Sequence, residues 1–283
     1  MTSSHRIDAH HHVWDLAVRD QAWTAELPVL HRSYLFGELL PELDAAAIDR
    51  TVLVQTISIA QETPEFLALA AAEPRIGGVV GWVDLTGADM ADRIAELSGL
   101  PGGDRLVAIR HQVQGESDPR WLCRADVRRG LHDVSEADLA YDLLVLPHQL
   151  PAAIETVRAL PECRFVLDHA AKPPIAAGEI EPWRSYVTEL AGCENVAVKL
   201  SGLITEADLD RWTVDELRPF ADVLLSSFGA ERIMFGSDWP VCLLAGSYQQ
   251  VLDTAEILVA GLSQSERAAV FGGTAARWYR LEV

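Results

Sequence analysis

Three histidines and one aspartate in this chain follow short apolar runs, where their side chains could act together. They are His10, His12, His169 and Asp238. Alternate residues of an extended segment point the same way, so His10 and His12 can share one cavity while His11 points elsewhere. Imidazole nitrogens and a carboxylate oxygen suit Zn²⁺ or Mn²⁺ and leave room for a water molecule. Such an ion would lower the pKa of that water, and Asp238 could accept its proton.

Other polar residues also follow apolar runs. Arg110 and His111 end the run VAIRH, and Lys199 lies inside VAVKLSG, where it faces either the barrel interior or a partner carboxylate. His148 is only a weak candidate for a site residue. Each residue has an alternative explanation; Asp238, for example, could be a helix N-cap before Pro240. Their recurrence at the ends of most runs favours one shared site.

The elements that must position these residues alternate between short apolar runs and longer helical stretches. Eight runs read as strands, spaced by roughly one β-loop-α-loop unit each. They are Ile7–Ala9, Thr51–Thr56, Gly78–Asp84, Leu106–Arg110, Tyr141–Leu146, Arg164–Leu167, Val196–Leu200 and Arg232–Phe235.

Between these runs, apolar residues recur at helical spacing. The clearest helices are Pro64–Glu73, Ala88–Ser98, Leu150–Ala159, Trp183–Leu190, Val214–Phe228 and Tyr248–Leu262. Strands that are apolar throughout are typical of a parallel sheet covered on both faces. The sequence therefore predicts an α/β fold, a single (β/α)8 TIM barrel over residues 1–283, with the active site at the C-terminal ends of the strands. A doubly wound sheet is the alternative, although no GxGxxG follows an early strand. The stretch from Asp15 to Asp44 is expected to be a large loop with short helices.

Composition narrows the class of partner. The formal net charge of −19 makes nucleic acid and an anionic membrane surface improbable partners. The four cysteines form no CxxC pair, which favours free thiols in a reducing compartment. No secretory signal or transmembrane run is visible, so a cytoplasmic protein is expected.

Six segments together resemble the amidohydrolase superfamily. They are IDAHHHVWD, VAIRHQVQGESDPRWL, YDLLVLPHQLPAAIE, FVLDHAAKPPI, VKLSGL and IMFGSDWPV, and they span nearly the whole chain. The chain is most similar to the amidohydrolase-2 branch, which contains L-fuconolactonase, L-rhamnonolactonase and 2-pyrone-4,6-dicarboxylate lactonase. The resemblance implies a hydrolase that opens a lactone ring, most simply that of a sugar acid.

The resemblance also implies roles for individual residues. The HxH motif corresponds to His10 and His12, and the motifs after the sixth and eighth strands correspond to His169 and Asp238. These four would be the metal ligands, with Asp238 as the base for water and His169 and His111 as further catalytic groups. Substrate would be held by Arg110, Lys172, Trp14, Trp82 and Trp239.

One feature departs from the binuclear members of the superfamily, which bridge two metals with a carboxylated lysine after the fourth strand. Arg110 and His111 occupy that place here, so one divalent ion is expected, with Zn²⁺ favoured and a metal-free site as the alternative. A small lactone is the expected partner. A metal-dependent decarboxylase and a non-catalytic metal- or sugar-binding barrel are the alternative functions. The sequence does not fix the lactone or the oligomeric state.

Overall fold

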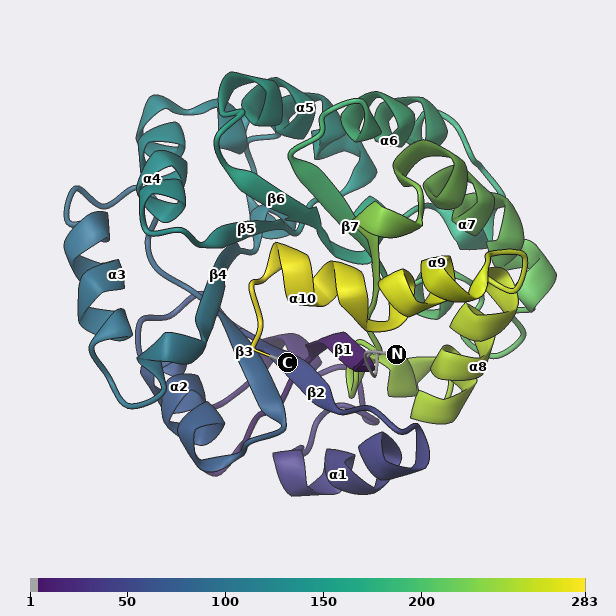
Figure 1. Cartoon of the computed structure of the whole chain (residues 1–283), viewed down its shortest axis with the longest axis horizontal. Helices are drawn as coiled ribbons and strands as arrows, with labels where there is room; N and C mark the ends of the chain where they lie inside the picture. The colour runs from purple at the N-terminus through teal and green to yellow at the C-terminus, as the bar shows by residue number, and fades with distance from the viewer. Residues whose placement is uncertain (1–4, 283) are drawn as a thin grey trace.

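Eight parallel strands form one sheet in the computed structural model, which describes residues 5–282 (Figure 1). Each strand pairs with the next in sequence order, from β1 to β8. The strands are β1 (Ile7–His11), β2 (Arg50–Val54), β3 (Ile76–Gly81), β4 (Leu106–His111), β5 (Ala140–Leu143), β6 (Arg164–Leu167), β7 (Val196–Leu200) and β8 (Ile233–Phe235).

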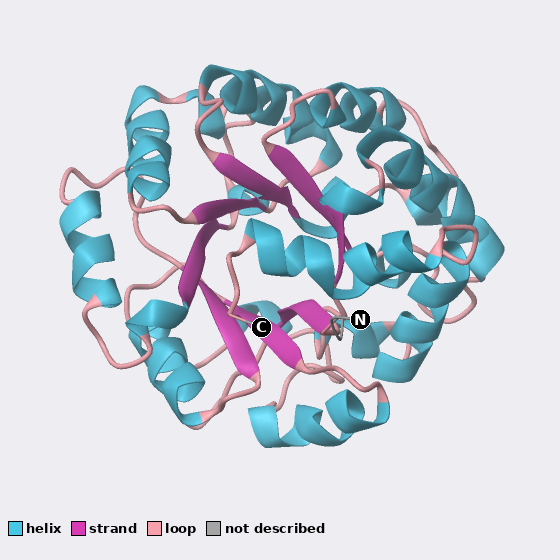
Figure 2. Cartoon of the chain, viewed as in Figure 1, coloured by secondary structure: helices cyan, strands magenta, loops and turns pink. Residues whose placement is uncertain are grey.

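Helices surround this ring of strands, as Figure 2 shows, which confirms the predicted (β/α)8 barrel. The outer helices are α1 (Phe36–Ala45), α2 (Glu62–Ala72), α3 (Met90–Ser98), α4 (Ala125–Glu136), α5 (Leu150–Ala159), α6 (Trp183–Ala191), α7 (Val214–Phe228) and α8 (Tyr248–Leu258). Two short helices, α9 (Gln264–Ala268) and α10 (Thr274–Trp278), follow.

Element boundaries differ from the predicted ones where apolar sequence continues beyond the hydrogen-bonded ladder. The strands β3 and β5 end before the predicted limits of Asp84 and Leu146. The apolar residues Val83, Leu144 and Val145 lie beyond the strand ends and are buried in loops. The helix predicted to reach Leu262 ends at Leu258. Burial, not strand geometry, therefore explains the apolar residues in these extensions.

The barrel closes between β1 and the segment that follows β8. The amide of Asp238 donates to the His10 carbonyl at 2.8 Å, and the amide of His12 donates to the Trp239 carbonyl at 2.7 Å. The buried carboxylate of Asp8 accepts from the Ser237 amide at 2.8 Å. We call these contacts the β1–β8 seam. They hold His10 and His12, at the end of β1, next to Asp238, which follows β8.

Small and branched apolar side chains fill the barrel interior, and α10 closes one end of it. Figure 1 shows α10 lying across the middle of the ring. Its residues Ala275 and Trp278, followed by Tyr279 and Leu281, pack in the same buried cluster as strand residues such as Ala108. The loops that follow the strands therefore lie at the opposite end of the barrel.

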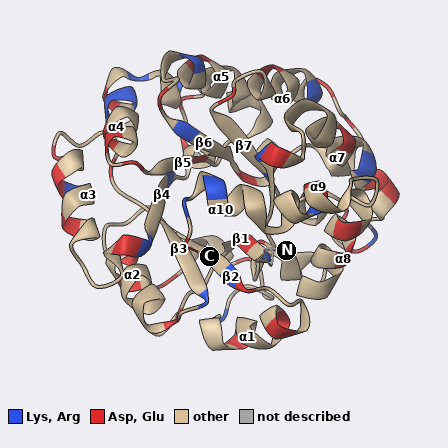
Figure 3. Cartoon of the chain, viewed as in Figure 1, with Lys and Arg blue, Asp and Glu red and all other residues tan. Residues whose placement is uncertain are grey.

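Charged residues are distributed over the outer helices, and Figure 3 shows acidic and basic segments interspersed there. Several form ion pairs between neighbouring elements, such as Arg19 with Glu65 and Arg128 with Glu155. Within residues 5–282, none of the helices combines the length and apolar character needed to cross a membrane.

Leu281 follows α10 and packs against the barrel. Its replacement tests whether this C-terminal segment helps to close one end of the barrel. Leu281 is buried, and a Cβ atom added at Gly78 would lie only 2.9 Å from its Cδ2. We expect Leu281→Ala to lower the free energy of unfolding by about 2–4 kcal/mol, because it opens a cavity in a packed interior. Chemical denaturation measures this loss. The same change at Leu209, which is 41% exposed, should have little effect on the free energy of unfolding. Equal losses in the two variants would contradict a role for Leu281 in closing the barrel.

Candidate active site

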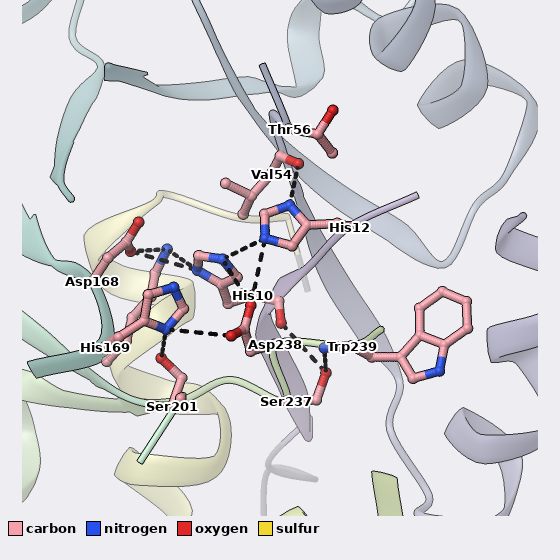
Figure 4. Close-up of polar contacts among 12 residues, drawn as sticks. His10, His12, Val54, Thr56, Asp168, His169, Ser201, Ser237, Asp238 and Trp239 are labelled. Carbon is pink, nitrogen blue, oxygen red and sulfur yellow. Dashed lines mark hydrogen bonds and ion pairs between the residues drawn. The ribbon is translucent and has the colours of Figure 1, made fainter. Parts of the chain in front are cut away.

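The structure brings together the four residues predicted to form the site, at the C-terminal ends of β1, β6 and β8 (Figure 4). The Nε2 atoms of His10 and His12 are 3.1 Å apart. Asp238 Oδ1 lies 3.4 Å from His12 Nε2 and 3.6 Å from His10 Nε2. Nδ1 of His169 is 3.9 Å from Asp238 Oδ2. As the alternation predicts, His11 points elsewhere, with its Nε2 3.0 Å from Thr51 Oγ1.

An unusual turn carries His169 from the end of β6 into the site. His169, Ala170, Ala171 and Lys172 all have positive φ, between 49° and 59°. A left-handed conformation costs about 1–2 kcal/mol for each L-residue other than glycine, so tertiary contacts must hold this turn. The buried indole of Trp183 donates from Nε1 to the Ala170 carbonyl at 2.6 Å. This strained turn aims two predicted site residues, His169 and Lys172, towards one cavity.

Two glycines allow backbone to approach the histidines closely. A Cβ atom at Gly236 would lie 2.7 Å from His10 Cβ, and one at Gly202 would lie 2.8 Å from His169 Nδ1. Gly202 also has a φ of 66°, which other residues rarely adopt. Ser201, beside it, places its Oγ 2.9 Å from His169 Nδ1. The β7 loop therefore fixes the ring of His169 by both contact and hydrogen bonding.

Burial controls the charges of the cluster. Desolvation lowers the pKa of His169 to about 4 and holds the pKa of His10 well below its ordinary value, where the nearby Lys199 adds to the effect. Burial alone would raise the pKa of Asp238, but His169, His12 and His10 outweigh it and keep the pKa below the usual range. The cluster thus pairs the ionised carboxylate of Asp238 with the uncharged imidazoles of His10 and His169, an arrangement that attracts a cation.

The donor set also fits a divalent metal ion. Ligand atoms of His10, His12 and Asp238 all lie within 4.8 Å of one another. Asp238 Oδ1 is buried, yet it has no hydrogen-bond partner among the residues that the structure describes. A buried carboxylate oxygen without a donor is costly, and a metal ion or a water would satisfy it.

A buried ionic network lies beside the histidines in the barrel interior. Lys199 from β7 forms ion pairs with Asp142 from β5 at 2.6 Å and with Asp168 at 2.8 Å. The Tyr279 hydroxyl donates to Asp142, and Arg110 pairs with Asp168 at 2.9 Å. The sequence left Lys199 facing either the interior or a carboxylate, and the structure shows that it does both. The network connects Tyr279, which directly follows α10, to the site, because Lys199 also contacts His10.

A cavity of about 560 Å³ opens above the cluster. Five of the predicted site residues line it: His12, His169, Asp238, Arg110 and Lys172. Arg110 is only 2% exposed and is already paired with Asp168, so it lies at the floor of the cavity. Lys172 is more accessible, with Glu206 3.7 Å from its Nζ. This volume suits a small molecule.

Five predicted site residues lie outside this cavity lining: the fully buried His10, and His111, Trp14, Trp82 and Trp239. His111 stacks on Trp121, accepts from Trp82 Nε1 at Nδ1, and places Nε2 2.8 Å from Glu116 Oε1. The indole of Trp14 donates to the Arg32 carbonyl. Trp239 packs on Tyr34 and, in Figure 4, points away from the imidazoles. Trp82, Trp14 and Trp239 thus pack against protein groups, and His148 is exposed at the surface.

The cavity has further lining residues that the sequence did not single out. Thr56, Gln112 and Gln114 offer uncharged hydrogen-bonding groups, and Trp23 offers a ring that is 39% exposed. Its Nε1 donates to Gln21 at 2.8 Å, which fixes the indole. Thr56 and Gln112 follow shortly after β2 and β4, so their position after a strand was the available signal. Trp23 lies in the long loop after β1, where the sequence carried no signal that it would line the cavity.

Comparison with known proteins places this geometry in a family. The amidohydrolase family model matches residues 7–281. The chain is 42% identical to L-fucono-1,5-lactonase from Burkholderia multivorans, over 98% of this chain and 96% of that protein. It is 37% identical to L-fucono-1,5-lactonase from Burkholderia ambifaria, with the same coverage of 98% and 96%.

A crystal structure gives the same answer for the fold. An amidohydrolase from Burkholderia multivorans with bound zinc superimposes with a TM-score of 0.92 at 40% identity, covering 98% of this chain and 100% of that one. The chain therefore belongs to the amidohydrolase family, as its strand-end histidines and aspartate indicated.

The clearance at Gly202 gives a test of how His169 is placed. We expect Gly202→Ala to cost about 1–3 kcal/mol of stability, since it introduces strain and a steric contact with His169. It should also impair any activity that depends on His169. Gly178 has a φ of 66° but no atom within 4 Å of an added Cβ, so Gly178→Ala isolates the strain. Thermal unfolding and turnover of both variants separate the effects. If both retain full activity, the contact does not position His169.

Proposed function

We propose that this protein hydrolyses the lactone of a sugar acid, with L-fucono-1,5-lactone as the leading candidate. The observation that carries the proposal is the unpartnered Asp238 Oδ1, which lies beside three imidazoles at a cavity of about 560 Å³. The two L-fucono-1,5-lactonases at 42% and 37% identity support the choice of substrate. Uncharged groups such as Gln112 and Gln114 suit a substrate rich in hydroxyls.

Asp238 is placed to act as the general base. Its ionised carboxylate can accept a proton from a water molecule at Oδ1, and that water then attacks the carbonyl carbon of the lactone. The bond from this carbon to the ring oxygen breaks as the tetrahedral intermediate collapses. The proton held by Asp238 passes to the departing ring oxygen, which yields the open hydroxy acid. His169, 3.9 Å away, is the group available to orient Asp238 or to relay this proton.

Positive groups would stabilise the charge that develops on the carbonyl oxygen. Arg110 and Lys172 line the same cavity as Asp238, from β4 and from the strained turn after β6. Fixed charges in a water-poor site stabilise an oxyanion without reorganising during the reaction. We propose that Lys172 contacts substrate directly and that Arg110, already paired with Asp168, acts from the floor.

His10, His12, His169 and Asp238 would hold one divalent ion, for which zinc is our proposal. Such an ion supplies Lewis acidity, polarising the carbonyl and lowering the pKa of a bound water. The structural relative with bound zinc supports this assignment. We further propose that the protein acts in the cytoplasm on a small lactone.

Replacement of Asp238 tests the base. We expect Asp238→Asn to lower kcat/KM for L-fucono-1,5-lactone by roughly 10²- to 10⁴-fold, because the amide cannot accept the proton. The change keeps size and shape, so thermal unfolding should remain close to that of the parent. A pH indicator follows acid release. Asp222→Asn, on the exposed face of α7, serves as the control. A folded Asp238→Asn variant with parental turnover would refute the mechanism, and binding without turnover by the parent would favour a non-catalytic barrel.

The ligand set has a separate test. Metal-free protein should take up about one zinc ion per chain in competition with a chromogenic chelator, and His12→Ala should weaken that uptake. His132, whose side chain is 53% exposed, provides a control histidine on α4. Equal zinc affinity in His12→Ala and His132→Ala would contradict the proposed site.

A further inference from the structure

Lys199 is a fully buried cation that the proposed mechanism does not use. Its side chain is inaccessible to solvent in the barrel interior. Its Nζ donates to Asp142 Oδ2 at 2.6 Å and forms an ion pair with Asp168 Oδ1 at 2.8 Å. A third contact joins it to the site, because Nζ lies 3.1 Å from His10 Nδ1 with hydrogen-bond geometry.

This third contact determines which nitrogen of His10 carries a hydrogen. An ammonium group has three donors and no acceptor, so His10 Nδ1 must accept from Lys199 through its lone pair. An uncharged imidazole with an unprotonated Nδ1 carries its hydrogen on Nε2. His10 therefore presents an N–H group, and not a lone pair, to the space that it shares with His12 and Asp238.

His12 is arranged to receive that hydrogen. Its Nδ1 lies 2.8 Å from the Val54 carbonyl, which can only accept, so Nδ1 is protonated and Nε2 has a free lone pair. His10 Nε2 lies 3.1 Å from this atom. Donation thus runs in one direction, from Lys199 through His10 to His12 and on to the Val54 carbonyl. The competing contacts of His10 are longer: Arg110 Nη1, a donor, lies 3.5 Å from Nε2, and Asp168 Oδ1, an acceptor, lies 3.5 Å from Nδ1.

A metal ligand needs the opposite arrangement at His10. To bind zinc through Nε2, the ring must move its hydrogen to Nδ1 and give up the bond from Lys199. The acceptor within reach of Nδ1 is then Asp168 Oδ1, at 3.5 Å, which already faces Lys199. We propose that Lys199 holds His10 as the Nε2–H tautomer and thereby weakens zinc binding, making it a positioning residue that sets metal affinity. The proposal rests on the zinc site of the proposed function.

A charge-balanced pair of substitutions separates this effect from simple electrostatics. Removing Lys199 alone would leave the buried Asp142 carboxylate without a cation, and the added negative charge would itself attract zinc. The double variant Lys199→Met/Asp142→Asn removes one charge of each sign, while Arg110 still pairs with Asp168. Tyr279 can donate to the new amide oxygen as it does to Asp142. The matched control is Arg19→Met/Glu65→Gln, an equally balanced pair that lies away from the four proposed ligands.

Two measurements test the proposal. In metal-free parent protein labelled with ¹⁵N-histidine, the spectrum should show His10 protonated at Nε2, with the signal assigned by its loss in His10→Gln. In the Lys199→Met/Asp142→Asn variant, chelator competition should show zinc binding about 10- to 100-fold tighter, the range seen when partners of metal ligands are changed. The control pair should leave zinc affinity unchanged.

Either of two results would overturn the proposal: protonation of His10 at Nδ1 in the metal-free parent, or unchanged zinc affinity in the double variant. The tautomer measurement uses the parent alone, so it decides the matter even if the variant fails to fold. Lactone turnover by the parent remains an independent result. The proposed function can therefore stand while this inference fails.

Discussion

Hydrogen bonding across the β1–β8 seam is the constraint on which the site depends. The seam joins His10 and His12 to Asp238 and Trp239, which lie far apart in the sequence, through backbone amides and carbonyls. Backbone bonds leave little freedom in where the attached side chains begin. The shared register of the two segments thus brings the imidazoles and the carboxylate within about 4 Å of one another, before any side-chain contact is considered.

The interior of this barrel carries costs that do not serve stability. Four consecutive residues from His169 to Lys172 adopt a left-handed conformation. Lys199, Asp142 and Asp168 have lost their hydration, which costs several kcal/mol for each ion before the attraction between the partners offsets it. Apolar residues of similar volume would often be at least as stable in such a place. The remaining apolar interior therefore offsets features whose benefit lies in the placement of His10 and His169.

The fold and the clustering of His10, His12, His169 and Asp238 could be predicted from the sequence because both follow from periodic local patterns. A strand buried on both faces is apolar throughout, so a polar residue after it, such as His169 or Asp238, stands out. The orientation of Trp14, Trp82 and Trp239 could not be predicted, because loop packing decides where these side chains point. The same alternation that separates His11 from His10 also directs His111 away from Arg110, and His111 lies outside the cavity that Arg110 lines.

The position of α10 has a consequence for how the chain folds. All eight strands precede α10 in the sequence, yet Tyr279 and Trp278 complete the barrel interior. Ribosomes add roughly 5–20 residues per second, so the strands are synthesised seconds before α10 is available. A barrel that formed before Tyr279 docked would leave the Asp142–Lys199 pair open to water from that end. Docking of the C-terminal segment is therefore the step that would remove water from this end of the core.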